Sequence, residues 1–242
     1  MRPLRSLMVT LALLAPAPLL AQMGSEPTPM ALDLKKVPVG SWAEYTMKIG
    51  LGAGMTVKSR WALVARDANS NTIETSAEGP PLEPVGGKML MKLVLVPDPV
   101  KSDRPVKQMV LKRGETDPMD MPLDLPGMPV QRFEKPDPKK LVGKETVKVA
   151  AGTFKASHYR DVSDTATIDL WISDEVPPLG VLKLTTVPKP GAQGPMGQPL
   201  PPVDMQLTAK GKDAKPVITK PAKPFDPAAL RPGAPPAPAP AK

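Results

Sequence analysis

His158 is the only histidine in the 242 residues, and its surroundings predict a carboxylate contact. It lies in the segment 143–160, which alternates polar and apolar residues, breaks at 150–153 and then alternates again. A four-residue loop at the break aligns the large apolar residues on one buried face and places Glu145 opposite His158 on that inward face. A carboxylate there would favour the charged form of the imidazole. The pattern leaves open a polar contact inside a cavity or a structural pair near the rim of a sheet.

A Met- and Asp-rich stretch at 115–129 holds the second set of residues with potential chemistry. The thioether sulfurs of Met119, Met121 and Met128 are soft ligands of the kind that Cu(I) prefers. Methionine also fills irregular apolar gaps, so the same residues could cover the edge of a sheet. No histidine lies nearby in sequence. We therefore expect no metal site and no cofactor, and keep these three methionines as the candidates if a metal binds.

Catalytic motifs are scarce. The chain has no cysteine, which excludes disulfides, thiol catalysis and a lipid-modified N-terminal cysteine. It has no Gly-x-Ser-x-Gly nucleophile motif, and its carboxylates cluster at turns, where they are usually solvated. Aromatic residues, which commonly form sugar-binding platforms, make up only 3% of the chain. We therefore expect a protein that is not an enzyme.

The net charge of +8 does not indicate a nucleic-acid partner. Residues 22–209 carry 23 basic and 22 acidic side chains, so most of the excess lies in the two terminal segments. A nucleic-acid interface needs a basic face with aromatic residues for stacking. The basic C-terminal tail could instead contact an envelope component, and we expect any membrane contact to be peripheral.

The N-terminus has the organisation of an export signal. Arg2 and Arg5 precede the apolar run 7–20, and Ala21 is a small residue suited to cleavage. The run is short for a transmembrane span and contains two prolines. We expect an exported protein located in the periplasm, on the cell surface or outside the cell.

Period-2 alternation dominates the rest of the chain and predicts about ten strands. We expect a mostly β fold with minor helix, built as a single curved antiparallel sheet or an open half-barrel. The predicted organisation is a signal peptide (1–21), a lead-in (22–32), a β domain (33–211) and a disordered Pro/Ala/Lys-rich tail (212–242). The predicted strands are 43–49, 55–65, 72–78, 88–96, 106–112, 144–149, 154–162, 167–173, 180–187 and 203–210.

Three short motifs carry a family resemblance. Residues 142–154 (VGKETVKVAAGTF), 169–173 (DLWIS) and 177–183 (PPLGVLK) resemble those of uncharacterised exported bacterial β-proteins. Several of those proteins are similar to the lipoprotein-carrier (LolA/LolB-like) fold. That resemblance implies a strongly curved open sheet whose concave face holds acyl chains, and it supplies no catalytic residues.

The leading functional hypothesis is a non-catalytic binding protein for a lipid or another hydrophobic small molecule. The alternative is an envelope structural or interaction protein with an ordinary packed core, and a less favoured one is a metal carrier that uses the methionine loop. Under the first hypothesis the ligand contacts an apolar face made by Met47, Val57, Trp61, Met89, Met91, Leu93, Phe154 and Leu182.

Overall fold

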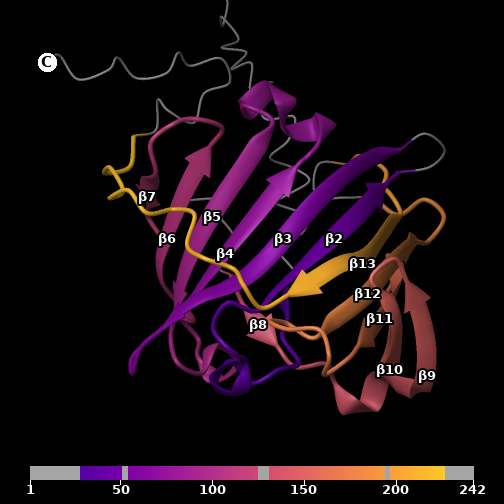
Figure 1. The fold of residues 1–242 in the computed structure, drawn as a ribbon. Helices are drawn as coiled ribbons and strands as arrows, with labels where there is room; N and C mark the ends of the chain where they lie inside the picture. The colour runs from indigo at the N-terminus through magenta and orange to yellow at the C-terminus, as the bar shows by residue number, and fades with distance from the viewer. Residues whose placement is uncertain (1–27, 51–53, 125–130, 194–196, 227–242) are drawn as a thin grey trace, which may run out of the picture.

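The computed structural model describes residues 28–50, 54–124, 131–193 and 197–226. These residues form an antiparallel sheet of 11 strands in the order β7-β6-β5-β4-β3-β2-β13-β12-β11-β10-β9 (Figure 1). A second, parallel sheet joins two short strands, β1 (Thr28–Pro29) and β8 (Phe133–Glu134). The predicted signal peptide lies outside the described residues.

All ten predicted strands are present, which confirms the predicted mostly β class and the open antiparallel sheet. The structure adds a short edge strand, β7, inside the methionine-rich stretch. Four short 3-10 helices lie between strands: η1 (Leu34–Lys36), η2 (Pro80–Val85), η3 (Pro99–Lys101) and η4 (Pro138–Lys140). The strands of the large sheet are β2 (Trp42–Ile49), β3 (Met55–Arg66), β4 (Asn71–Glu78), β5 (Lys88–Leu95), β6 (Val106–Arg113), β7 (Met119–Met121), β9 (Leu141–Val149), β10 (Gly152–Val162), β11 (Ala166–Ile172), β12 (Val181–Pro188) and β13 (Val203–Gly211).

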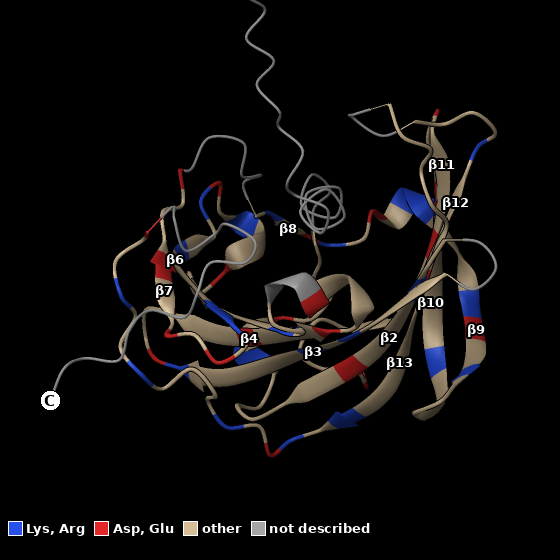
Figure 2. Cartoon of the chain, turned by 90° about the horizontal axis from the view of Figure 1, so that it is seen from above, with Lys and Arg blue, Asp and Glu red and all other residues tan. Residues whose placement is uncertain are grey.

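The large sheet is bent, so that β9–β12 stand up from a floor formed by β2–β7 (Figure 2). We call the side that the bend encloses the inner face, and the opposite side the outer face. Alternation along β2–β5 sends most of the apolar residues of these strands to the inner face. The inner-face residues Tyr45, Leu63, Ile73 and Leu93 are almost fully buried in the main core.

The N-terminal segment covers part of the inner face. Met30 and Leu34 are buried in the same core as Phe133 of β8. The guanidinium of Arg66 holds η1 in place by donating to the backbone carbonyls of Leu34 and Val37. Met30, which precedes the predicted domain start at residue 33, therefore leaves water by packing on the sheet.

The β9–β10 hairpin differs from its predicted register. Val149 pairs with Gly152 across a two-residue turn, so Glu145 lies opposite Ala156, and His158 lies opposite Gly143. The predicted and observed registers differ by two residues, which keeps every side chain on its face, so apolar alternation could not separate them. Gly152 has a φ of +134°, a conformation that favours glycine and supports the tighter turn.

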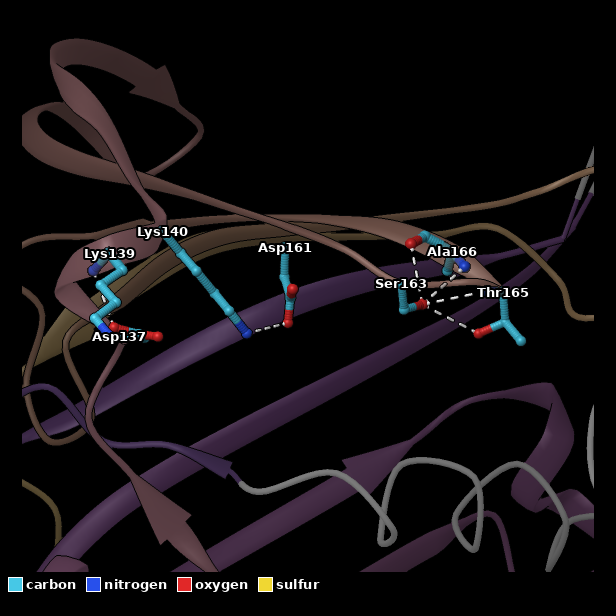
Figure 3. A network of polar contacts seen from close by, with 7 residues as sticks. All are labelled: Asp137, Lys139, Lys140, Asp161, Ser163, Thr165 and Ala166. Atoms are coloured by element: carbon cyan, nitrogen blue, oxygen red, sulfur yellow. Dashed lines mark hydrogen bonds and ion pairs between the residues drawn. The ribbon is translucent and has the colours of Figure 1, made fainter.

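Side-chain contacts fix the C-terminal end of β10 and the segment that leads into β9 (Figure 3). Asp137 caps η4 by accepting a hydrogen bond from the backbone N–H of Lys139 at 2.9 Å. The ammonium of Lys140, the last residue of η4, contacts the carboxylate of Asp161 on β10 at 2.5 Å. In the turn between β10 and β11, the Ser163 hydroxyl accepts from the backbone N–H of Ala166 at 3.1 Å. These contacts position the chain where it enters β9.

The outer face carries a C-terminal strap, residues 212–226, which crosses the sheet from β13 toward β7 (Figure 1). Ile218 packs on Leu90 and Val110. The carboxylate of Glu74 accepts from the backbone N–H groups of Val217 and Ile218 at 2.6 and 3.0 Å. We expected a disordered tail from residue 212, but the strap is extended, as its prolines require, and held to the sheet. Residues 227–242 lie outside the described residues.

The strap also completes one edge of the sheet. The backbone N–H of Lys223 donates to the Pro118 carbonyl at 2.8 Å, and the N–H of Asp120 donates to the Lys223 carbonyl at 2.8 Å. Asp117 contacts the ammonium of Lys223 at 2.8 Å. The short strand β7 is thus covered along its outer edge.

The buried carboxylate of Glu74 gives the first prediction. Glu74→Ala should lower the free energy of unfolding by about 2–3 kcal/mol, because it removes two charge-assisted bonds and leaves two strap N–H groups without an acceptor. Urea denaturation would measure this change. Glu78→Ala, an exposed position on the same strand, is the matched control and should change little. If deletion of residues 212–242 leaves the cost of Glu74→Ala undiminished, the strap is not what Glu74 stabilises.

Candidate functional site

The eight predicted ligand-contacting residues divide into two groups. Met47, Leu93, Phe154 and Leu182 are buried, with at most 6% of their surface exposed. Leu93, Phe154 and Leu182 belong to the main core cluster. The other four, Val57, Trp61, Met89 and Met91, are only half-buried. The predicted apolar face is thus part packed core and part accessible surface.

The half-buried residues lie in three neighbouring cross-strand rows of the inner face. Trp61 on β3 aligns through Thr75 with Met91 on β5 and then with Leu111 on β6. Toward the other end of β3, Val57 pairs with Met47, which pairs in turn with Met205 of β13. We call this set the apolar strip. Its half-buried members are Val57, Trp61, Met89, Met91, Leu111 and Met205.

A polar cluster lies on the outer face of β9–β12. Nε2 of His158 donates to Oδ1 of Asp169 at 2.6 Å, and Nε of Arg160 donates to the same oxygen at 2.7 Å. His158 and Asp169 each expose 12% of their side chains. The sequence prediction missed Asp169 as the partner of His158. The sequence feature that could have indicated this role is that Asp169 is the single carboxylate within the otherwise apolar stretch 168–172.

Glu145 contacts His158 from the other side of the ring, at 3.5 Å between Oε1 and Nδ1. It reaches the histidine diagonally rather than from the directly opposite position. Oε1 of Glu145 also accepts from the indole N–H of Trp171 at 2.5 Å. The rings of His158 and Trp171 stack with centroids 4.4 Å apart, and the ammonium of Lys183 lies 4.9 Å from the Trp171 ring centroid. The imidazole is therefore fixed by two carboxylates and a ring.

The charges of this cluster balance one another. Burial raises the pKa of Asp169, but the hydrogen bonds from Arg160 and His158 outweigh it and hold that pKa below its usual range. The same contact with Asp169 raises the pKa of Arg160. No hydroxyl of the described residues shares a hydrogen bond with His158. The arrangement positions β10 against β11, and it lacks the hydroxyl partner that a serine-type nucleophile would supply.

The methionine candidates have other contacts. Met119 and Met121 are buried on β7, and the Met119 sulfur accepts from the backbone N–H of Asp226 at 3.3 Å. Met128 lies outside the described residues. Within the described ranges, no group of three His, Cys, Asp or Glu side chains could hold a metal ion. Among the same residues, no helix is long and apolar enough to cross a membrane.

Comparisons with known proteins give only distant likenesses. No family model and no curated protein matches the chain. A hypothetical protein from Chlamydia trachomatis is similar at a TM-score of 0.39 and 13% identity, covering 79% of this chain and 95% of its own. A candidate exported protein with a YmcC-like fold from Bacteroides fragilis has a TM-score of 0.35 and 10% identity, covering 76% and 100%. A DUF1329 family protein from Desulfovibrio piger has a TM-score of 0.32 and 10% identity, covering 81% and 90%. The lipoprotein-carrier resemblance stays a prediction.

The polar cluster gives the second prediction. Asp169→Asn should cost about 1–2 kcal/mol of stability at pH 7, because the carboxylate loses its charge-assisted bonds. The pKa of Asp169 is depressed in the folded protein, so its contribution is complete above the unfolded pKa of about 3.9 and is lost as the pH falls through the folded pKa. The stability difference between the two proteins should therefore shrink below about pH 4.

Urea denaturation at a series of pH values would measure this difference. Asp164→Asn, in the exposed turn between β10 and β11, is the control and should behave like the parent protein. A difference that stays constant down to low pH would show that Asp169 stabilises the fold by packing rather than by charge.

Proposed function

We propose that this protein is an exported, non-catalytic binding protein that holds a hydrophobic ligand on the apolar strip. The observation that carries the proposal is the partial exposure of six apolar side chains in neighbouring cross-strand rows on the enclosed side of a bent sheet. Residues of the same face nearer to η1, such as Leu63 and Leu93, are sealed in the core. Three of the six, Trp61, Met91 and Met205, pack against that core from its margin. A group of apolar side chains that stays partly accessible to water favours binding over a purely structural role.

The composition of the strip suits a chain-like apolar ligand. Half of its members are methionines, whose unbranched side chains adapt to ligands of different shape. Trp61 adds a large rigid surface. Between the members on β3 and those on β5, strand β4 contributes Thr75 and Ala77. These side chains are small, so they leave a shallow depression in the strip. Such a surface fits an acyl chain lying across the strands.

The ligand would be bound outside the cytoplasm. The apolar run 7–20 and Ala21 support export through a cleaved signal, with the protein acting in the periplasm or at the cell surface. The absence of cysteine is compatible with an oxidising compartment, because no thiol is at risk there.

A fatty-acid titration gives the third prediction. Dansyl-undecanoate, a fluorescent fatty acid, should bind saturably, and the emission of Trp61 should change because its ring lies in the strip. Val57→Glu places a charge in the strip and should weaken binding roughly tenfold, which corresponds to about 1.4 kcal/mol. Thr56→Glu is the matched control, since Thr56 is the preceding residue on β3, is exposed, and points to the outer face.

Native mass spectrometry of the protein purified from its host gives an independent measure. We expect a co-purifying lipid mass that is absent from Val57→Glu. Probe binding that is equal in Val57→Glu and Thr56→Glu, with no lipid on the purified protein, would mean that the strip is only the margin of a packed core.

A further inference from the structure

One edge of the large sheet is covered by another segment of the chain, and the other edge is open. The C-terminal strap pairs with the short edge strand β7. The opposite edge strand, β9, is nine residues long, and within the described ranges it pairs only with β10. Figure 2 shows β9 at the outer margin of the upright part of the sheet. An open edge of this length offers backbone groups to another extended chain.

The register of the hairpin identifies which backbone groups are open. The two-residue turn makes Val149 and Gly152 a hydrogen-bonded pair, and such pairs recur at every second residue. Odd-numbered residues of β9 therefore bond to β10. The N–H and C=O groups of Lys144, Thr146 and Lys148 point away from it, toward the free edge.

These same three residues send their side chains to the inner side of the sheet. Lys144, Thr146 and their β10 neighbour Lys155 line an open groove of about 560 Å³, together with Lys135. Its acidic lining residues are Glu145 and Asp174. Among the described residues, no carboxylate lies within 4.0 Å of the ammonium groups of Lys144, Lys148 or Lys155.

We propose that β9 accepts an extended acidic segment of another protein, which adds a twelfth strand to the sheet. Residues of the added strand that pair with Lys144 and Lys148 share their face, so carboxylates four positions apart would meet both ammonium groups. The residue midway between those carboxylates would face Thr146. Backbone hydrogen bonds between β9 and the added strand supply affinity, and Lys144 and Lys148 select for carboxylates at the two matching positions of the partner.

A second copy of the chain fits this edge poorly. Two copies of β9 related by a twofold axis must pair residues of the same face. Centring on Lys144 places it opposite its own copy, and centring on Glu145 opposes two glutamates. Centring on Thr146 places Lys144 opposite Lys148, and centring on Lys148 opposes two lysines. Centring on Val147 opposes no like charges, but it pairs neither Lys144 nor Lys148 with a carboxylate. An acidic partner can pair both lysines with carboxylates, so charge favours it over self-pairing.

Peptide binding to the full mature chain tests the proposal and is the fourth prediction. The probe is a blocked nine-residue peptide in a Thr/Ser/Val background, with glutamates at its third and seventh positions. The control peptide moves the second glutamate to the sixth position, which sends the two carboxylates to opposite faces of a strand. We expect the probe to bind at least roughly fivefold more tightly than its isomer, because only the probe satisfies both lysines.

Two variants test the two halves of the mechanism. Lys144→Glu with Lys148→Glu should weaken probe binding roughly tenfold or more, through reversal of both charge pairs. The control, Lys48→Glu with Lys58→Glu, changes the same net charge at exposed positions on β2 and β3 and should bind nearly as the parent does. Thr146→Pro removes a backbone donor that points away from β10, so it should weaken binding while the melting temperature stays within a few degrees.

Equal affinity for the two peptides, or equal loss in the two double variants, would overturn the proposal in favour of general charge attraction. Sedimentation of the protein alone should show a monomer. A dimer that Thr146→Pro dissociates would also overturn it, because the edge would then be occupied by a second copy.

Discussion

A single open sheet of 11 strands has two faces and two edges, and the structure depends on how the chain covers them. The described residues contain no long helix that could be laid over a face. The sheet instead bends, and the enclosed side is closed partly by its own curvature and partly by β1, η1 and β8 (Figure 2). The strap then covers apolar residues on the outer side and one edge. What these devices leave uncovered is the apolar strip and the edge of β9.

The two uncovered regions have opposite chemistry although both border the enclosed side. The strip on β3–β6 and β13 is apolar, whereas the same side of β9 and β10 carries lysines and hydroxyl residues. The difference arises from the hairpin. There the apolar residues Val149, Phe154 and Ala156 are buried on the outer face, which they share with His158, and this leaves the alternate positions to face the groove. One bent sheet thus offers a surface without charge beside a surface rich in positive charge.

Strand positions could be predicted because alternation is a local property, and each of the ten predicted strands is present. Alternation does not indicate which distant segments of the chain pair or pack together. A shift of two residues leaves the alternation unchanged, which is why the hairpin register was wrong although the residues that share a face were predicted correctly. That face was predicted to point inward, whereas strand pairing places Glu145 and His158 on the outer face. The strap has few apolar residues, and its anchor at Glu74 lies 143 positions away from Val217. The pairing of His158 with Asp169 likewise needed the alignment of β10 with β11. Part of the predicted ligand face, including Leu93 and Leu182, is packed core because segments distant in sequence cover it.

The strand order also shows how the chain is joined. Strands β2–β7 follow one another as a meander, and β9–β13 form a second one. They pair with each other where β2 lies beside β13, and the Thr208 hydroxyl there donates to the Glu44 carbonyl, 164 positions away. Each meander can form through contacts between neighbouring strands, but the seam between them requires the last strand to find the first. Closing that seam brings together the two ends of the domain, so the slow, entropy-limited step of folding falls at the centre of the sheet. Until β13 pairs with β2, the core residues of each meander lack their packing partners from the other meander.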